Sequence, residues 1–288
     1  MTVLSEAKTW RAPRMRAMCM VAMLAMAFNA TPSAAQEPEG LFATAAAGSQ
    51  IKVDHSVWSS LLTKHVKRNA SGLNEVDYAG FRATDLAPLR AYITAITRVD
   101  PATLDRPEQF ALLANLYNAK TIEIVLDHYP VASIKDISLG GTVLSVVTGG
   151  PWKKKVVEIS GTPISLDDIE HGLLRPIFKD PRVHYALNCA SIGCPNLRTE
   201  AFTGEQLETQ LDAAAREFIN HSRGVQLADG KLRVSSIYSW FVEDFGGDDD
   251  GVIAHLKKYA AEPLATQLNT VTAVDDHFYD WKLNDVDR

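Results

Sequence analysis

One long apolar segment in the middle of the chain limits its possible folds more than any other feature. Residues 106–130, RPEQFALLANLYNAKTIEIVLDHYP, repeat apolar side chains at helical spacing, and neighbouring apolar positions widen the stripe. Pro107 suits the first turn of a helix, and Pro130 marks its end. A helix that is apolar over so much of its surface has to be buried. We therefore expect a domain built around this helix.

The segments on either side predict further helices and short hairpins. Hairpins are expected at residues 156–166, with a turn at Ser160-Gly161, and at 225–235, with a turn at Asp229-Gly230. Helices are predicted at residues 55–66, 83–97, 203–222, 236–246 and 250–260, a buried strand at 182–188, and extended structure at 269–285. Helices and strands do not alternate regularly, so the fold class is α+β. We predict a single domain in which the central apolar helix packs with several helices against a small, mostly antiparallel sheet.

The first 35 residues have the organisation of a secretory signal peptide. Four basic residues precede an apolar run of twelve residues, 17–28, and small residues follow it. The run is shorter than the roughly 20 residues that cross a bilayer, so we expect no transmembrane anchor. We predict cleavage near Ala35 and export to the periplasm or secretion. A flexible segment is expected at 36–50, followed by one globular domain at 51–288.

The charge of the chain excludes some classes of partner. Its net charge is −6, and removal of residues 1–35 makes it more negative, because that segment holds four basic residues and one acidic residue. Nucleic acids and anionic lipids are bound by clustered lysine and arginine. We therefore expect no nucleic-acid partner. The expected ligand is a small molecule or a peptide-like molecule, and no cofactor is predicted.

Five ordered segments carry a recognisable pattern: ANLYNAKTIEIVLDHYP, GTPISLDDIEHGLLR, DPRVHYALNCASIGCPNLR, WFVEDFGG and YDWKLND. Together they resemble successive signature segments of the domain of unknown function 547 family, over roughly residues 70–285. The resemblance implies a fold but no reaction, because no function is established for the family. Bacterial members are often exported, which agrees with the N-terminal segment. The function has to be argued from the residues themselves.

Two cysteines follow the N-terminal segment, Cys189 and Cys194, in the stretch HYALNCASIGCPNL. Thiols of exported proteins tend to pair. A disulfide needs Cα atoms about 4.4–6.8 Å apart, whereas residues five apart in a straight strand lie about 16 Å apart. A bond between them therefore requires the chain to reverse at ASIGC, which Gly193 makes feasible. So short a loop favours a local shaping role over a large gain in stability.

A nucleophilic thiol is the alternative. Cys194 precedes Pro195 and is expected at the N-terminus of a helix, where a thiolate is stabilised. His184 approaches Cys194 if the chain doubles back, and Glu170 is the first candidate to orient the imidazole, with Asp180 and Asn118 as others. This is the logic of papain-like and transglutaminase-like hydrolases. In those folds the cysteine comes before the histidine and begins the central helix, so the site here would be permuted or divergent.

Other polar residues are candidates for binding. Asn115 and Asn118 share one face of the apolar helix, and they must either bind backbone near the cysteine loop or line a cleft. His171 and Arg182 belong to a polar cluster at residues 170–184, which is either part of a site or a salt-bridge network such as Arg182 with Glu170.

A metal site is less well supported by the sequence than a disulfide or a nucleophilic thiol. His171, His184, Cys189 and Cys194 offer mixed ligands, but no second ligand pair accompanies the cysteines, so no metal site is predicted. The acidic stretch at 244–251 lacks the pattern of a calcium loop and is expected to cap the helix that follows.

Two functions follow. The first is a divergent cysteine-type hydrolase or acyltransferase that acts on peptide or cell-wall amides, with Cys194, His184 and Glu170 as catalytic residues. Its binding residues would be Asn115, Asn118, His171 and Arg182. The second is a non-catalytic periplasmic binding or envelope-assembly module with a Cys189–Cys194 disulfide.

Overall fold

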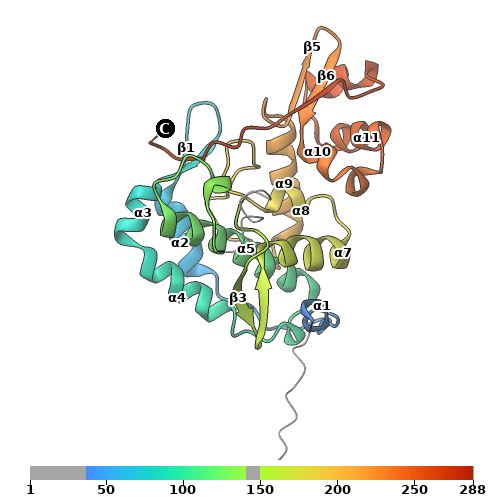
Figure 1. Ribbon diagram of the computed structural model, residues 1–288. Coiled ribbons are helices and arrows are strands. Elements are labelled where there is room, and N and C mark those ends of the chain that lie inside the picture. Colours follow the sequence, from blue (N-terminus) through green and yellow to red (C-terminus); the bar gives the residue numbers. More distant parts are fainter. Residues whose placement is uncertain (1–36, 141–149, 288) are drawn as a thin grey trace, which may run out of the picture. The chain divides into compact units, whose positions relative to one another are not determined.

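The long helix predicted in the middle of the chain is present and buried. The computed structural model describes residues 37–140 and 150–287, and helix α5 (Arg106–His128) lies in the middle of the ribbon in Figure 1. The side chain of Asp105 caps its first turn by accepting a hydrogen bond from the Glu108 N–H (3.0 Å). Every residue from Glu108 to Leu126 except Lys120 is buried. The helix therefore forms the centre of the core.

Shorter helices surround α5. In Figure 1, α2, α3 and α4 lie on one side of it and α7, α8 and α9 on the other. The described residues hold, besides α5, the helices α1 (Pro38–Leu41), α2 (Ser56–His65), α3 (Tyr78–Thr84), α4 (Leu86–Ile96), α7 (Arg175–Phe178), α8 (Val183–Ala186), α9 (Leu207–Ile219), α10 (Ile237–Trp240), α11 (Asp249–Tyr259) and α12 (Leu264–Gln267). They also hold the π-helix η3 (Asp168–Leu174) and the 3-10 segments η1 (Pro101–Thr103), η2 (Ile134–Asp136), η4 (Val242–Phe245) and η5 (Leu268–Thr270).

The described strands form three small sheets where one sheet was predicted. Strands β1 (Val66–Arg68) and β2 (Asn74–Val76) pair antiparallel, as do β3 (Lys155–Ile159) and β4 (Thr162–Ser165). The third sheet holds the antiparallel pair β5 (Val225–Ala228) and β6 (Lys231–Ser235), with β7 (Asp276–Phe278) parallel to β6. Both predicted hairpins are confirmed. The pairing is mostly antiparallel, and the α+β class is confirmed.

Two hydrophobic clusters fill the interior. The larger one surrounds α5 and includes Phe42, Phe110 and Leu187. The second joins α9, α11 and the three-stranded sheet, with Phe218, Tyr238 and other buried aromatic residues. The described residues all belong to one compact unit, so both clusters belong to the same body. The papain-like or transglutaminase-like part of the fold prediction stays a prediction.

The segment 276–285 crosses from one cluster to the other. Strand β7 pairs with β6, and farther along the chain the Val76 N–H donates to the Asn284 carbonyl (2.8 Å). Figure 1 shows this red segment running from the β5–β6 hairpin toward β1. On its way it passes the cysteine loop. One short stretch of chain therefore ties both clusters and the loop together.

Two local predictions near the cysteines are wrong. Residues 182–188 contain helix α8 where a strand was predicted, because a short apolar run has the same pattern in a buried helix and in a buried strand. Cys194 does not begin a helix: residues 195–206 are irregular, and α9 begins at Leu207. The helix-dipole argument for a stabilised thiolate at Cys194 therefore fails.

The N-terminal predictions fall partly outside the described residues. Residues 1–35, predicted to be a signal peptide, lie outside them. Within the segment predicted to be flexible, α1 is followed by the buried Phe42. The Arg106 side chain donates hydrogen bonds to the carbonyls of Phe42 (2.7 Å) and Ala43 (3.0 Å). Among the described residues, no helix has the length and apolar character needed to cross a membrane.

Candidate functional site

Cys189 and Cys194 form a disulfide, with their Cα atoms 6.2 Å apart. The chain reverses between them, as the bond requires, and the Cys194 N–H donates to the Ser191 carbonyl (3.1 Å). The residue in the left-handed region is Ala190, with φ of 59°, and not Gly193. The reversal was therefore predicted correctly, but its strained residue is an alanine, which prefers other conformations.

Gly193 has a different role. Its N–H donates to the Asp280 carbonyl (2.8 Å). A Cβ at this position would lie 2.9 Å from the Asp280 nitrogen and 3.0 Å from the Tyr279 ring. The loop and the segment 279–282 therefore touch so closely that only glycine fits between them. The neighbouring Ile192 N–H donates to the Lys282 carbonyl (2.9 Å) and adds a second backbone tie.

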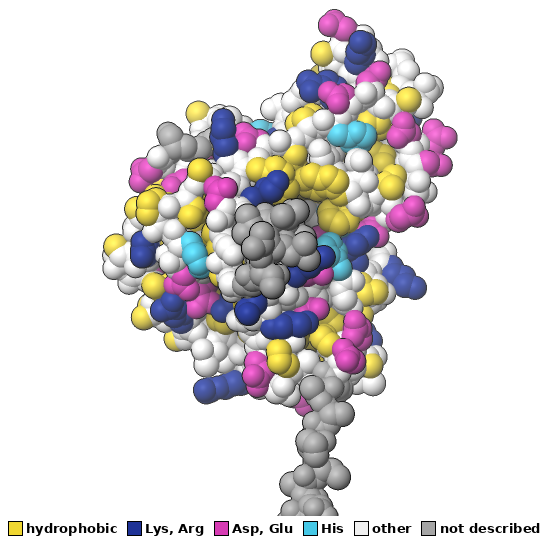
Figure 2. Space-filling view, in the orientation of Figure 1, with side chains coloured by type: hydrophobic (Ala, Val, Ile, Leu, Met, Phe, Trp, Pro, Cys, Tyr) yellow, Lys and Arg dark blue, Asp and Glu magenta, His cyan; other side chains and the backbone are white. Residues whose placement is uncertain are grey.

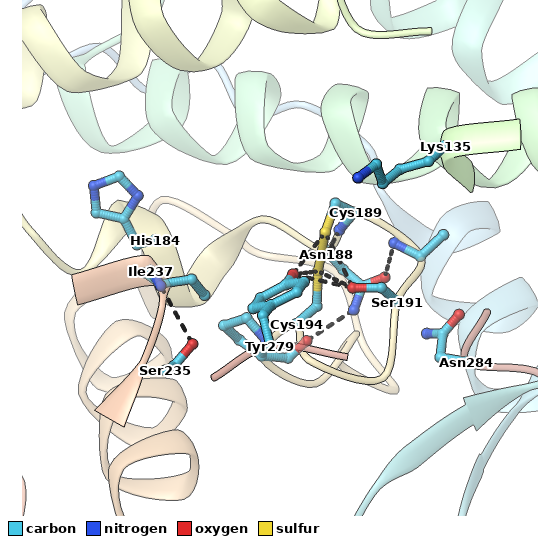
Figure 3. Close-up of a disulfide and its surroundings, with 12 residues drawn as sticks. Lys135, His184, Asn188, Cys189, Ser191, Cys194, Ser235, Ile237, Tyr279 and Asn284 are labelled. Atoms are coloured by element: carbon cyan, nitrogen blue, oxygen red, sulfur yellow. Dashed lines mark hydrogen bonds between the residues drawn. A yellow bond between two sulfur atoms is a disulfide. The ribbon is translucent and has the colours of Figure 1, made fainter. Parts of the chain in front are cut away.

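Polar groups surround the two sulfur atoms. The Tyr279 hydroxyl lies 3.1 Å from each Sγ, and the Ser191 hydroxyl lies 3.5 Å from each. Ser191 also donates to the Tyr279 oxygen (3.0 Å). Burial raises the pKa of Tyr279 well above its usual range, so its hydroxyl stays protonated and able to donate at neutral pH. Figure 3 shows the Tyr279 ring beside the disulfide, with Ser191 next to it.

The disulfide lies on the wall of a cavity of about 730 Å³. Residues of both hydrophobic clusters line it. Its aromatic lining consists of Tyr117, Trp152, Trp240, Phe241, Tyr279 and Trp281. Its charged and titratable lining consists of Lys135, Lys153, Lys154, Asp167, Glu170, His171 and His184. In Figure 2, hydrophobic and basic side chains lie next to one another on the face turned toward the reader. A pocket of this size with mixed lining is suited to a small ligand.

Glu170 and His171 reach the pocket from the π-helix η3. The predicted capping box fixes the start of this π-helix. The Asp168 N–H donates to Ser165 Oγ (3.0 Å), and the Ser165 N–H donates to Asp168 Oδ2 (2.6 Å). A π-helix is uncommon and is often found at functional sites. His171 Nδ1 lies 3.2 Å from the Arg175 guanidinium, so these two residues share a face as expected.

His184 is held between two carboxylates. Its Nε2 lies 2.7 Å from Asp244 Oδ2 and its Nδ1 lies 3.8 Å from Glu170 Oε1. The ring stacks on Phe241 at 4.2 Å. The hydrogen bond from His184, helped by that from Arg175, holds the pKa of Asp244 well below its usual range. The three predicted catalytic residues thus line the same cavity, but His184 is engaged by acids, and in Figure 3 its ring points away from the disulfide.

Asn118 binds backbone at the cysteine loop, which is one of its two predicted roles. Its amide donates to the Ala186 carbonyl (2.9 Å) and accepts from the Asn188 N–H (2.8 Å). Asn188 in turn accepts from the Ala190 N–H (2.9 Å). The central helix therefore positions the chain that enters the loop.

Asn115 makes the equivalent pair of bonds elsewhere. It donates to the Phe202 carbonyl (2.8 Å) and accepts from the Phe202 N–H (3.0 Å). Neither asparagine is among the residues that line the cavity. Both amides are therefore used to hold backbone.

Arg182 lies outside the cavity lining, in a network at the start of α8. Its guanidinium binds Asp180 (2.6 Å), Glu208 (2.7 Å) and Asp212 (2.9 Å). The salt-bridge alternative is confirmed, but its partner is not Glu170. The network ties α8 to α9 and gives Arg182 a structural role.

The acidic stretch at 244–251 caps a helix, as predicted: Asp248 caps α11 by accepting a hydrogen bond from the Gly251 N–H (2.9 Å).

Sequence reasoning missed Tyr279 and Asp244 as site residues. Both lie in segments that carried the family resemblance, YDWKLND and WFVEDFGG. Nothing local distinguishes them, because each acts through a contact 60 to 90 residues away in sequence. Among the described residues, no three His, Cys, Asp or Glu side chains are grouped to hold a metal ion.

Comparison with known proteins gives one match. Residues 101–219 match the family described as "Protein of unknown function, DUF547". No curated protein and no solved structure matches the chain. The matched range holds α5, η3, α8 and the disulfide, whereas Asp244 and Tyr279 lie beyond it. The match confirms the resemblance noted in the sequence over residues 101–219.

Proposed function

We propose that the domain is a non-catalytic binding module of the cell envelope and that its pocket takes an acidic saccharide. One observation carries the proposal: the same cavity is lined by an indole wall and by lysines that form no ion pair with any described residue. The indoles supply apolar faces, and the lysines supply positive charge. The two properties together match a sugar ring that bears a carboxylate.

The aromatic wall is built for stacking. Trp240 and Trp281 lie with ring centroids 5.7 Å apart and nearly parallel, at 27°. The Tyr279 ring lies 4.7 Å from Trp281. Trp240 is 48% exposed, which is unusual for the largest apolar side chain and leaves a free indole face. A pyranose ring presents a face of C–H groups to such an indole, while its hydroxyls at the ring edge meet groups such as Asp167 and His171.

The lysines favour a negative charge on the ligand. The Lys135 ammonium lies 5.0 Å from the centre of the Trp281 ring, and Lys153 and Lys154 line the same cavity. Within the described residues, none of the three forms a salt bridge. Their charge is therefore free to attract a carboxylate into the pocket.

The location of the domain is part of the proposal. Residues 1–35 have the pattern of a signal peptide, and a disulfide is typical of an oxidising compartment. Both favour an exported protein. Mass spectrometry of the protein purified from the producing cells tests this, because export with cleavage leaves Gln36 as the first residue.

Calorimetric titration with N-acetylmuramic acid and N-acetylglucosamine tests the ligand class, since the first sugar carries a carboxylate and the second does not. We expect tighter binding of the acid, and Trp240→Ala should weaken both sugars about tenfold because a stacking face is lost. Lys135→Gln should weaken only the acid. The matched control is Lys282→Gln, an exposed lysine outside the cavity lining. Absence of heat with both sugars would contradict the proposal.

The cysteine hydrolase is supported less well. It requires a reduced Cys194 and a His184 ring turned toward it, whereas Cys194 is bonded to Cys189 and His184 faces Asp244 and Glu170. One observation keeps it as a second candidate: His184 is oriented by a carboxylate in the cavity that Cys194 also lines. Rapid iodoacetamide labelling of Cys194 in the native protein would favour it.

A further inference from the structure

The two sulfur atoms of the disulfide have different surroundings. The Cys194 side chain is buried, with 2% of the residue exposed, while Cys189 is half-buried. Both residues line the cavity. A thiol that enters from the cavity therefore finds the sulfur of Cys189 more accessible than that of Cys194.

Hydrogen bonding adds a second asymmetry. The Cys189 N–H donates to Cys194 Sγ at 2.9 Å, and no described backbone N–H donates to the sulfur of Cys189. The hydroxyls of Tyr279 and Ser191 lie equally close to both sulfurs. After cleavage, Cys194 Sγ would thus have the Cys189 N–H as a donor that Cys189 Sγ lacks, besides the hydroxyls that lie near both sulfurs. Donors of this kind stabilise a thiolate, and a stabilised thiolate leaves faster in thiol–disulfide exchange.

Backbone hydrogen bonds hold the loop in addition to the disulfide. Its backbone is tied by the bonds of Ile192 and Gly193 to the segment 280–282, and Asn284 donates to the Ala190 carbonyl (3.2 Å). The bond itself joins residues only five apart, so it constrains the unfolded chain little. These ties favour a loop that holds both thiols close together after reduction, which a reversible disulfide requires.

We propose that Cys189–Cys194 is an electron acceptor in thiol–disulfide exchange with a dithiol that enters the cavity. A thiolate of the dithiol attacks Cys189 Sγ and forms a mixed disulfide, and the S–S electron pair leaves on Cys194 Sγ as a thiolate. The second thiolate of the substrate then attacks the substrate sulfur that is bonded to Cys189. This step closes the disulfide of the substrate and releases Cys189 as a thiolate. The substrate loses two electrons and becomes a disulfide, and the domain gains them as a dithiol. This proposal does not rest on the proposed saccharide ligand, although both molecules would enter the same cavity.

Single-cysteine variants of the full chain test which sulfur is accessible to a reactant that enters the cavity. With oxidised glutathione as probe, Cys194→Ser should take up one glutathione on Cys189 rapidly, as read by intact mass. Cys189→Ser should react at least about tenfold more slowly, because its remaining thiol is buried. Equal rates for the two variants would overturn the proposal.

The rate of reduction by dithiothreitol tests the thiolate donors. Tyr279→Phe should slow reduction of the disulfide about tenfold, since one hydrogen bond to the leaving thiolate is lost. Tyr259→Phe is the matched control, because its buried hydroxyl has no described partner and Tyr259 is not among the residues that line the cavity. An unchanged rate in Tyr279→Phe contradicts the proposed role. Near-ultraviolet circular dichroism of the reduced wild type supplies the final criterion: a retained signal is expected, and unfolding on reduction would show that the bond is structural.

Discussion

Replacement of Asn118 by leucine removes the link between the central helix and the cysteine loop. Leucine has a similar size but no polar atoms, so the Ala186 carbonyl and the Asn188 N–H both lose their partner. Asn118 is only 4% exposed, so water cannot replace the amide. A buried backbone group left without a partner costs about 1–3 kcal/mol, which gives about 2–6 kcal/mol for the pair.

Such a loss is a large part of the stability of a typical domain, which is about 5–15 kcal/mol. We expect the urea midpoint of Asn118→Leu to fall by about 1–2 M, from the usual slopes of urea unfolding. Tryptophan fluorescence and far-ultraviolet circular dichroism follow the transition. Coincidence of the two curves checks that unfolding is two-state.

Asn115→Leu is the matched control. It removes the same two kinds of hydrogen bond, here to Phe202, one helical turn away. Both variants should lose similar stability, but only Asn118→Leu should speed reduction of the Cys189–Cys194 disulfide in the absence of urea. A loss below about 1 kcal/mol in Asn118→Leu, or equal acceleration in the two variants, would refute the assignment of Asn118 as the anchor of the loop.

Three further results are expected. Gly193→Ala should destabilise the domain by about 1–3 kcal/mol, because its Cβ would meet Asp280 and Tyr279; an unchanged urea midpoint would contradict the close contact. Ala190→Gly should leave stability unchanged or raise it by about 1 kcal/mol, because glycine adopts the φ of 59° without strain; a clear loss would disprove strain at Ala190. Burial lowers the pKa of His55 from 6.5 to about 4, so the unfolded chain binds this proton first, and His55 should cost about 2 kcal/mol of stability between pH 7 and pH 5. Thermal unfolding should show a smaller fall over this range in His55→Phe, and equal falls would contradict the lowered pKa.

Local signals predicted the elements whose conformation they determine. The helix at Arg106–His128 follows from apolar spacing and from Pro107. The two hairpins follow from Ser160-Gly161 and Asp229-Gly230, since all four residues have positive φ, as tight hairpin turns demand. These patterns act over a few residues and can be read without tertiary contacts.

The errors have a different physical origin. A seven-residue apolar run at 182–188 is too short to distinguish α8 from a strand. The site itself depends on contacts distant in sequence: Tyr279 reaches the disulfide, and Asp244 reaches His184. Such contacts are set by packing of the two clusters, which no local pattern encodes. The disulfide could be predicted as one of two alternatives, the other being a free Cys194 thiol. Both cysteines lie in one short loop, so a bond between them depends only on local chain reversal.

The crossing of segment 276–285 over the cysteine loop has a consequence for biosynthesis. The loop is translated about ninety residues before Tyr279, yet Tyr279 and the backbone of Asp280 and Lys282 complete its surroundings. While those later residues are still inside the ribosome, the cysteines lack their hydroxyl neighbour and the cavity lacks part of its aromatic wall. Formation of the cysteine loop can therefore precede assembly of the pocket, which is complete only after Trp281 has left the ribosome.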